Sequence, residues 1–100
     1  EGLEREVASF LNTNGGELLI GVNNDGTVYG VDDVDAAQTK IAQRLDSNIK
    51  PSCLGLFDIH VERRADKRII KVVVSAGYER PYYLAKYGMT PKGCYYRVGA

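Results

Sequence analysis

Apolar residues recur at helical spacing in two stretches of the chain. The pattern in residues 2–12 predicts an amphipathic helix, which the Asn- and Gly-rich residues 12–16 are expected to end. A second pattern, from Val34 to Ile49, predicts a helix of about 15 residues that stops before Pro51.

Strand signals fill most of the remaining sequence. Residues 17–22 are apolar on both faces, which predicts a buried strand. The Asp-Gly pair at 25–26 predicts a tight turn, and residues 27–31 are expected to return as its partner strand. Alternating and β-branched residues predict further strands at 57–62, 69–75, 82–84 and 95–98, with a loop over 86–93. This order predicts an α+β fold, a two-layer sandwich of two helices on a mostly antiparallel or mixed sheet.

Composition narrows the class of protein. The 100 residues contain 44% apolar and 26% charged side chains, which is typical of one globular domain. No apolar stretch approaches the roughly 18 residues of a membrane span. Because the chain starts at Glu1 without Met, we interpret residues 1–100 as a single domain from a longer chain. Cys53 and Cys94 are too few for a disulfide framework, which indicates reduced thiols and a cytoplasmic location.

Charge is divided unevenly between the two halves of the chain. Residues 1–49 hold three basic and nine acidic side chains, whereas residues 50–100 hold ten basic and four acidic ones. Such asymmetry favours a face for nucleic acid or another acidic partner, unless the two halves interleave in space and the charges cancel.

Several kinds of site are excluded by their missing motifs. The sequence has neither the G-x-x-x-x-G-K-[ST] phosphate loop nor a G-x-G-x-x-G fingerprint, so no cofactor is expected and ATP binding by this domain alone is not expected. Asn23–Gly26 lacks the first ligand of a calcium loop, and one His leaves too few ligands for a usual zinc site. We therefore predict no metal.

Two groups of side chains are candidates for binding nucleic acid, because Arg and Lys contact phosphates while Tyr stacks on bases. The first lies in the C-terminal third and contains Arg80, Tyr83, Lys86, Tyr87, Lys92 and Arg97. The second is a basic cluster at the tip of the 57–75 hairpin and contains Arg63, Arg64, Lys67 and Arg68. Alternatively, the tyrosines belong to the core and the hairpin charges serve only solubility.

A third candidate is the loop that follows the first helix. Its members are Asn12, Thr13, Asn14, Gly15 and Gly16. Adjacent glycines allow close approach of the backbone, either to a ligand or to a neighbouring strand, so the loop is either a backbone site or a helix cap with a tight turn.

The sequence resembles a known family. Ser9–Val22, which reads SFLNTNGGELLIGV, resembles the signature of the Schlafen AlbA-type domain, formerly called the divergent AAA domain. The resemblance continues in Asp25–Val31, Ile49–Pro51, Val72–Ser75, Arg80–Leu84 and Tyr96–Gly99, and so covers nearly the whole chain. It implies a mixed α/β fold, and a domain missing the family's first strand.

The resemblance also implies a function. Such domains are found in bacterial transcriptional regulators and RecG-like helicase-related proteins, and their usual inferred role is nucleic-acid binding. Schlafen relatives include metal-dependent ribonucleases, which use two upstream glutamates and an Asp directly after the Gly-Val pair. That position is Asn23 here, and an uncharged amide is a poorer metal ligand. Asp25, two residues on, is a weak candidate catalytic residue.

Our leading hypothesis is therefore a non-enzymatic module that binds nucleic acid, with DNA favoured over RNA. The alternatives are a Schlafen-like metal-dependent ribonuclease and a module for protein interaction. Exposed sheet edges would also favour a homo-oligomer, since unpaired edges promote association.

Overall fold

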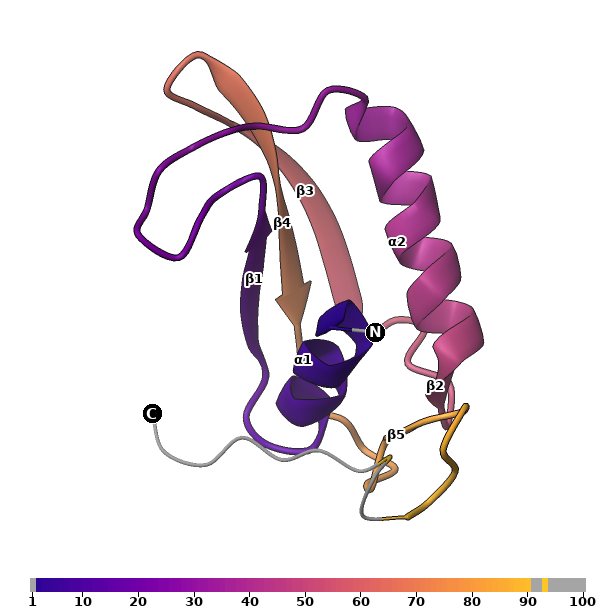
Figure 1. Cartoon of the computed structure of the whole chain (residues 1–100). Coiled ribbons are helices and arrows are strands. Elements are labelled where there is room, and N and C mark those ends of the chain that lie inside the picture. Colours follow the sequence, from indigo (N-terminus) through magenta and orange to yellow (C-terminus); the bar gives the residue numbers. More distant parts are fainter. Residues whose placement is uncertain (1, 91–92, 94–100) are drawn as a thin grey trace.

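The structure, a computed structural model, describes residues 2–90 and Gly93. Strand β4 pairs in antiparallel fashion with β1 and β3 in a three-stranded sheet, and β2 pairs with β5 in a two-stranded one (Figure 1). The elements within the described part are, in chain order, α1 (Gly2–Leu11), β1 (Gly16–Ile20), α2 (Val34–Asn48), β2 (Ile49–Lys50), β3 (Phe57–Arg64), β4 (Lys67–Val74) and β5 (Tyr83–Leu84).

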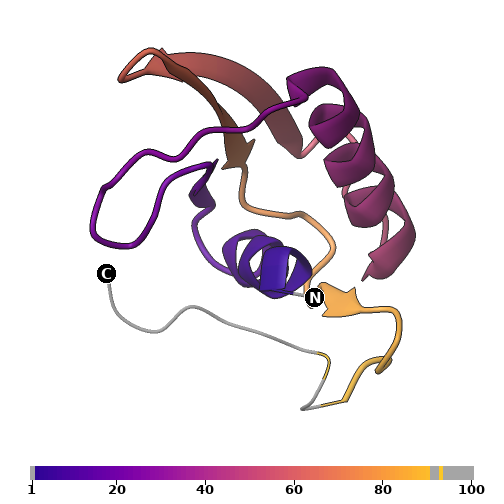
Figure 2. The same cartoon turned by 45° about the horizontal axis from the view of Figure 1, so that its top comes forward.

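The two helices lie on the same face of the three-stranded sheet, as both overall views show (Figures 1 and 2). Alternate residues of β4 point into this layer, so Ile70, Val72 and Val74 are buried. The helices and the β2–β5 end of the molecule supply the rest of the core: Val7, Phe10, Leu11, Ile41, Leu45, Ile49, Cys53 and Tyr82. This arrangement confirms the predicted α+β class.

Helices α1 and α2 are joined by a buried carboxylate. The side chain of Arg44 donates to both oxygens of Glu4, at 3.0 Å from Nε and 2.6 Å from Nη2, and Asn48 Nδ2 donates at 2.8 Å. Glu4 is only 3% exposed. Burial alone would raise the pKa of Glu4, but the hydrogen bonds from Arg44 and Asn48 outweigh it and hold the pKa at about 2.

Both helices and the hairpin formed by β3 and β4 agree with the sequence prediction to within two or three residues, but two strand predictions were wrong. The residues predicted as a fully buried strand form β1, which lies at the edge of the sheet and leaves Leu19 37% exposed. Residues 27–31 form no strand; a single bridge joins Val22 to Val28. Ile49 leaves the predicted helix and starts β2.

Residues 27–31 form no strand because of the backbone conformation at Gly21 and Gly30. The amides of Tyr29 and Gly30 both donate to the carbonyl of Gly21, so the segment folds back onto one residue instead of pairing along a ladder. Gly21 and Gly30 both have positive φ, which breaks extended geometry.

The predicted strand at 95–98 lies outside the described residues. Within the described part, β1 and β3 are the sheet edges, and association through them stays a prediction.

The buried carboxylate gives a pH-dependent prediction. Glu4→Gln should lower the free energy of unfolding by about 3 kcal/mol at pH 7, which is what a pKa depressed from 4.5 to about 2 corresponds to. Because the folded-state pKa lies below the unfolded-state value, this contribution is complete above about pH 4.5 and is lost as the pH falls toward 2. The difference from the parent chain should therefore narrow to about 1 kcal/mol at pH 3, as measured by urea unfolding.

Glu79→Gln is the matched control for this experiment. Glu79 is exposed, so removing its charge should change stability by less than about 0.5 kcal/mol at either pH. A penalty for Glu4→Gln that is the same at pH 7 and pH 3 would show that the charge of Glu4 does not stabilise the fold.

Candidate functional site

The most highly charged feature of the sheet is the end of the β3–β4 hairpin. We call residues Glu62–Arg68 the basic tip, because they hold four basic and two acidic side chains. The strands are joined by a two-residue turn in which Ala65 (φ 51°) and Asp66 (φ 61°) both have left-handed backbone conformations. Such a turn matches the twist of the strands, and it fixes the register of the side chains on either side.

The register brings like charges together. Arg63 lies directly opposite Arg68, and Arg64 lies opposite Lys67. Side chains that face each other in this way are close neighbours, so like charges destabilise the pair. Arg64 has a partial partner in Glu62, at 3.3 Å, but within the described residues Arg63, Lys67 and Arg68 form no ion pair. The basic tip thus carries positive charge that its neighbours do not neutralise.

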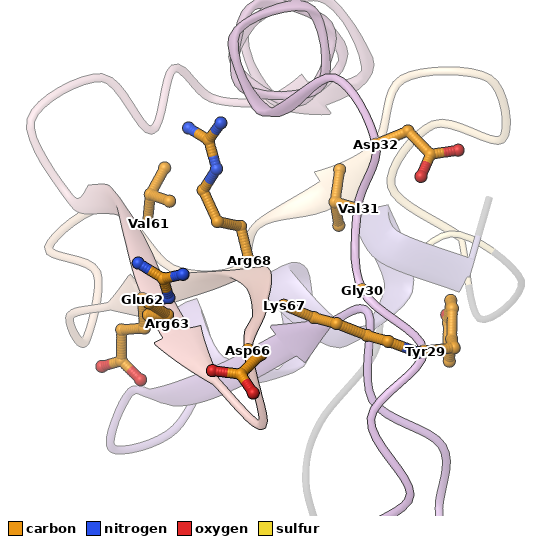
Figure 3. Close-up of a pocket in the computed structure, with 10 residues that line it drawn as sticks. All are labelled: Tyr29, Gly30, Val31, Asp32, Val61, Glu62, Arg63, Asp66, Lys67 and Arg68. Carbon is orange, nitrogen blue, oxygen red and sulfur yellow. The ribbon is translucent and has the colours of Figure 1, made fainter.

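A pocket of about 770 Å³ opens between the basic tip and the segment 29–32. The amide of Val31 donates to the carbonyl of Arg68 at 2.8 Å and holds the segment against β4. Gly30 lets the two approach, because a Cβ there would lie 3.1 Å from the Cβ of Lys67. Figure 3 shows the side chains that line the pocket: Tyr29, Gly30, Val31, Asp32, Val61, Glu62, Arg63, Asp66, Lys67 and Arg68.

Three carboxylates also line this pocket, and they differ in their surroundings. Glu62 is held by Lys71 at 2.8 Å and by Arg64 at 3.3 Å, and these bonds lower its pKa. The carboxylate of Asp32 points away from the arginines (Figure 3). Asp66 stays beside the basic side chains as an exposed acid of the turn.

The loop after α1 contacts its own chain closely. The side-chain amide of Asn12 donates to the carbonyl of Tyr82 at 2.9 Å and accepts from its amide at 2.6 Å. Thr13 donates its hydroxyl to the carbonyl of Ser9 at 2.7 Å, whereas Asn14 is exposed. A Cβ on Gly15 would lie 2.4 Å from the Val74 carbonyl oxygen, and one on Gly16 the same distance from the Phe10 ring.

The same hydrogen bonds anchor one end of the Arg80–Tyr83 segment. Tyr82 is buried, and its hydroxyl accepts from the amides of Tyr78 and Glu79, each at 3.1 Å. Arg80 is exposed, with its Nε donating to the carbonyl of Gly77 at 3.0 Å. Tyr83 is half-buried in β5. The structure therefore joins two segments that the sequence presented as separate candidates.

The other C-terminal candidates lie near β5. The ammonium of exposed Lys86 sits 5.5 Å from the centre of the half-buried Tyr87 ring. Lys86 also lines a smaller pocket of about 350 Å³ beside Glu4, Asn48 and Leu84. Lys92 and Arg97 lie outside the described residues. Figure 1 places β5 and the basic tip at opposite ends of the molecule, so Arg63 and Arg64 do not share a surface with Lys86.

Asp25 lies in an exposed turn. Its carboxylate accepts from the amide of Thr27 at 2.9 Å, and this bond lowers the pKa of Asp25. Across residues 2–90 and Gly93, no three His, Cys, Asp or Glu side chains gather closely enough to hold a metal ion. Asp25 therefore stays a candidate without an assembled set of partners in that part of the chain.

Sequence reasoning missed Tyr29 as a site residue. It treated residues 27–31 as a strand, whereas the structure leaves Tyr29 58% exposed at the rim of the pocket. The sequence signal that could have identified Tyr29 is the glycine that follows it. Gly30 has positive φ and allows the contact with Lys67.

The thiol of Cys53 is buried, and burial raises its pKa, so it is not a reactive group at either pocket.

Comparisons with known proteins agree with this architecture. The family model described as Schlafen, AlbA_2 matches residues 1–100. The N-terminal domain of an ATP-dependent DNA helicase RecG-related protein from Nitrosomonas europaea is similar, with a TM-score of 0.68 and 26% identity over 94% of this chain and 68% of that one. The DIP2311 protein from Corynebacterium diphtheriae has a TM-score of 0.69 and 26% identity, over 98% of this chain but 18% of its own. No curated protein matches the sequence.

The fold and the pocket define an α+β domain of two helices on an antiparallel sheet that ends in a basic hairpin. The chain belongs to the Schlafen AlbA_2 family, which confirms the resemblance seen in the sequence. Among the described helices, none combines the length and the apolar character needed to cross a bilayer.

The structural role of the loop after α1 can be tested by removing the hydrogen bonds of Asn12. Asn12→Ala should lower the free energy of unfolding by about 2 kcal/mol, because it leaves the buried amide and carbonyl of Tyr82 without partners. Asn14→Ala, two residues away and exposed, should change it by less than about 0.5 kcal/mol. Thermal and urea unfolding measure both, and equal effects would argue that the Asn12 bonds contribute little.

Proposed function

We propose that this domain binds nucleic acid, DNA in preference to RNA, through the basic tip. The observation that carries the proposal is the register that sets Arg63 opposite Arg68 and Arg64 opposite Lys67. The fold gains no stability from opposed like charges, and an external polyanion would supply the missing counter-charge. Membership of the Schlafen AlbA_2 family and the helicase-related neighbour support a nucleic-acid partner.

The geometry suits contact with a phosphate backbone. Arg63 and Arg68 present planar guanidinium groups on one face of the hairpin, and each can hold a phosphate through two parallel hydrogen bonds. Arg64 and Lys67 face the opposite side of the hairpin, so a nucleic-acid strand that passes the tip meets positive charge on both faces. These phosphate contacts are available on single strands and on duplexes alike. Where the partner is a duplex, a two-stranded ribbon is narrow enough to enter the major groove of DNA but not the deep and narrow major groove of RNA, which favours DNA over RNA.

In this proposal the domain is the binding module of a larger cytoplasmic protein, such as a bacterial transcriptional regulator or a RecG-like helicase-related protein. It supplies affinity and orientation rather than chemistry. Without a phosphate-binding loop in the sequence, any ATP hydrolysis falls to another part of such a protein.

The proposal is tested by titrating labelled DNA and following fluorescence anisotropy at several salt concentrations. The double variant Arg63→Ala/Arg68→Ala should weaken binding by at least about tenfold. It should also reduce the slope of log K against log[salt] by about one if the two arginines share a phosphate and by about two if they contact separate ones. Its stability should not fall, because the variant removes a like-charge pair.

Two other double variants make the test specific. Lys40→Ala/Lys50→Ala removes the same charge from exposed positions on α2 and β2 and should change affinity by less than about twofold. Arg80→Ala/Lys86→Ala tests the C-terminal candidates at the other end of the molecule. If this variant loses binding while Arg63→Ala/Arg68→Ala keeps it, the interface lies around β5 and the proposal for the basic tip is wrong.

Asp66, the acidic residue of the turn, gives a prediction in which substitution strengthens DNA binding instead of weakening it. Asp66→Asn should strengthen DNA binding by about threefold, because it removes a negative charge beside Lys67 and Arg68. Asn tolerates the left-handed conformation of this position, so the turn should be kept. The same anisotropy titration measures the gain, and Asp46→Asn, on the exposed face of α2, should give none.

A further inference from the structure

We propose that the pocket beside the basic tip holds one unpaired nucleotide, with its phosphate on Arg63 and Arg68 and its base stacked on Tyr29. This inference rests on the proposed function and specifies the form of nucleic acid that it favours: a single strand or an unpaired base, rather than a continuous duplex.

The base-stacking side is Tyr29. Its side chain is 58% exposed although it borders a pocket, and within the described residues no aromatic ring contact occupies it. Figure 3 shows Lys67 extending from β4 toward Tyr29, so the aromatic ring and a cation lie together at one side of the pocket. Aromatic rings of this kind bind bases with little sequence preference, because every base offers a π-face.

The phosphate side is the pair Arg63 and Arg68. Figure 3 shows both guanidinium groups at the other side of Lys67 from Tyr29. In the described part of the chain neither arginine has a carboxylate within ion-pair distance, and Glu62 is already held by Lys71 and Arg64. A phosphate placed between the two guanidinium groups would relieve their mutual repulsion and accept hydrogen bonds from both.

The space between these two sides fits a nucleotide. The pocket volume of about 770 Å³ lies within the range of roughly 300–1,000 Å³ that small-molecule sites occupy. Val31 and Val61 contribute apolar surface to its lining, and Val61 is 39% exposed although Ile59, which precedes it on that face of β3, packs against the core. The aromatic ring suits a base, the apolar surface beside it suits a sugar, and the two arginines suit a phosphate.

This arrangement discriminates against duplex DNA. In a duplex the faces of each base are covered by its neighbours, so only a base that has left the stack reaches Tyr29. Phosphate contacts at Arg63 and Arg68, by contrast, are available to single and double strands alike. The tyrosine should therefore contribute to the binding of single strands and not to that of duplexes.

The test uses three labelled probes of equal length: oligo(dT), the same backbone with abasic sites in place of every base, and a duplex. Tyr29→Ala should weaken binding of oligo(dT) by about tenfold and should change binding of the abasic strand and the duplex by less than about twofold. Tyr29→Phe, which keeps the ring, should bind oligo(dT) as the parent does. Tyr78→Ala is the matched control, because Tyr78 is 88% exposed but lines neither pocket.

The outcomes separate this inference from the proposed function. If Tyr29→Ala leaves oligo(dT) binding unchanged, or weakens all three probes equally, while Arg63→Ala/Arg68→Ala still weakens all of them, the nucleotide pocket is wrong and the proposed function stands. If the parent chain binds none of the probes at low salt, both are wrong. If Tyr78→Ala matches Tyr29→Ala, stacking occurs elsewhere and the pocket is again overturned.

Discussion

The pairing register of β4 is the constraint on which the rest of the structure depends. This strand is hydrogen-bonded on both sides, and its register with β3 sets Ile70, Val72 and Val74 toward the helices. The same alternation, two residues earlier, sets Arg68 on that face opposite Arg63. A shift of one residue would turn the core toward solvent and separate the two arginines, so burial of the core also fixes the geometry of the basic tip. Core and candidate site are thus consequences of one ladder.

The basic tip differs from the rest of the chain because its residue types are energetically unfavourable at their positions. Elsewhere the core-facing apolar residues of the helices and β4 are buried, and the buried carboxylate of Glu4 is partnered by Arg44 and Asn48. At the tip, Ala65 occupies a left-handed conformation that costs a non-glycine residue roughly 1–2 kcal/mol, and two like-charge pairs oppose each other. Such departures concentrate where function rather than stability selects the sequence, and this is the physical basis for assigning the site there.

Much of the architecture follows from local patterns. The helices, the β3–β4 hairpin and the basic cluster at its tip can each be read from a window of ten to fifteen residues, because helical periodicity, alternation and turn residues are local signals. The strand expected at 27–31 failed because two amides converge on the carbonyl of Gly21, a bond pattern that no periodicity encodes. Leu19 is exposed because its position opposite Lys71 puts its side chain on the face of the sheet that neither helix covers.

The pocket could not be predicted from sequence for the same reason. It forms where Tyr29 and Gly30 meet Lys67 and Arg68, which lie almost forty residues further along the chain. The most recognisable stretch of sequence, Ser9–Val22, does something different: Asn12 ties the loop after α1 to Tyr82, and Gly15 and Gly16 leave room for neighbouring atoms of the same chain. A motif that builds the frame tolerates little change, because each of its contacts is buried or sterically tight. The basic tip is exposed on both faces, so its charges and its turn can be changed without disturbing the core.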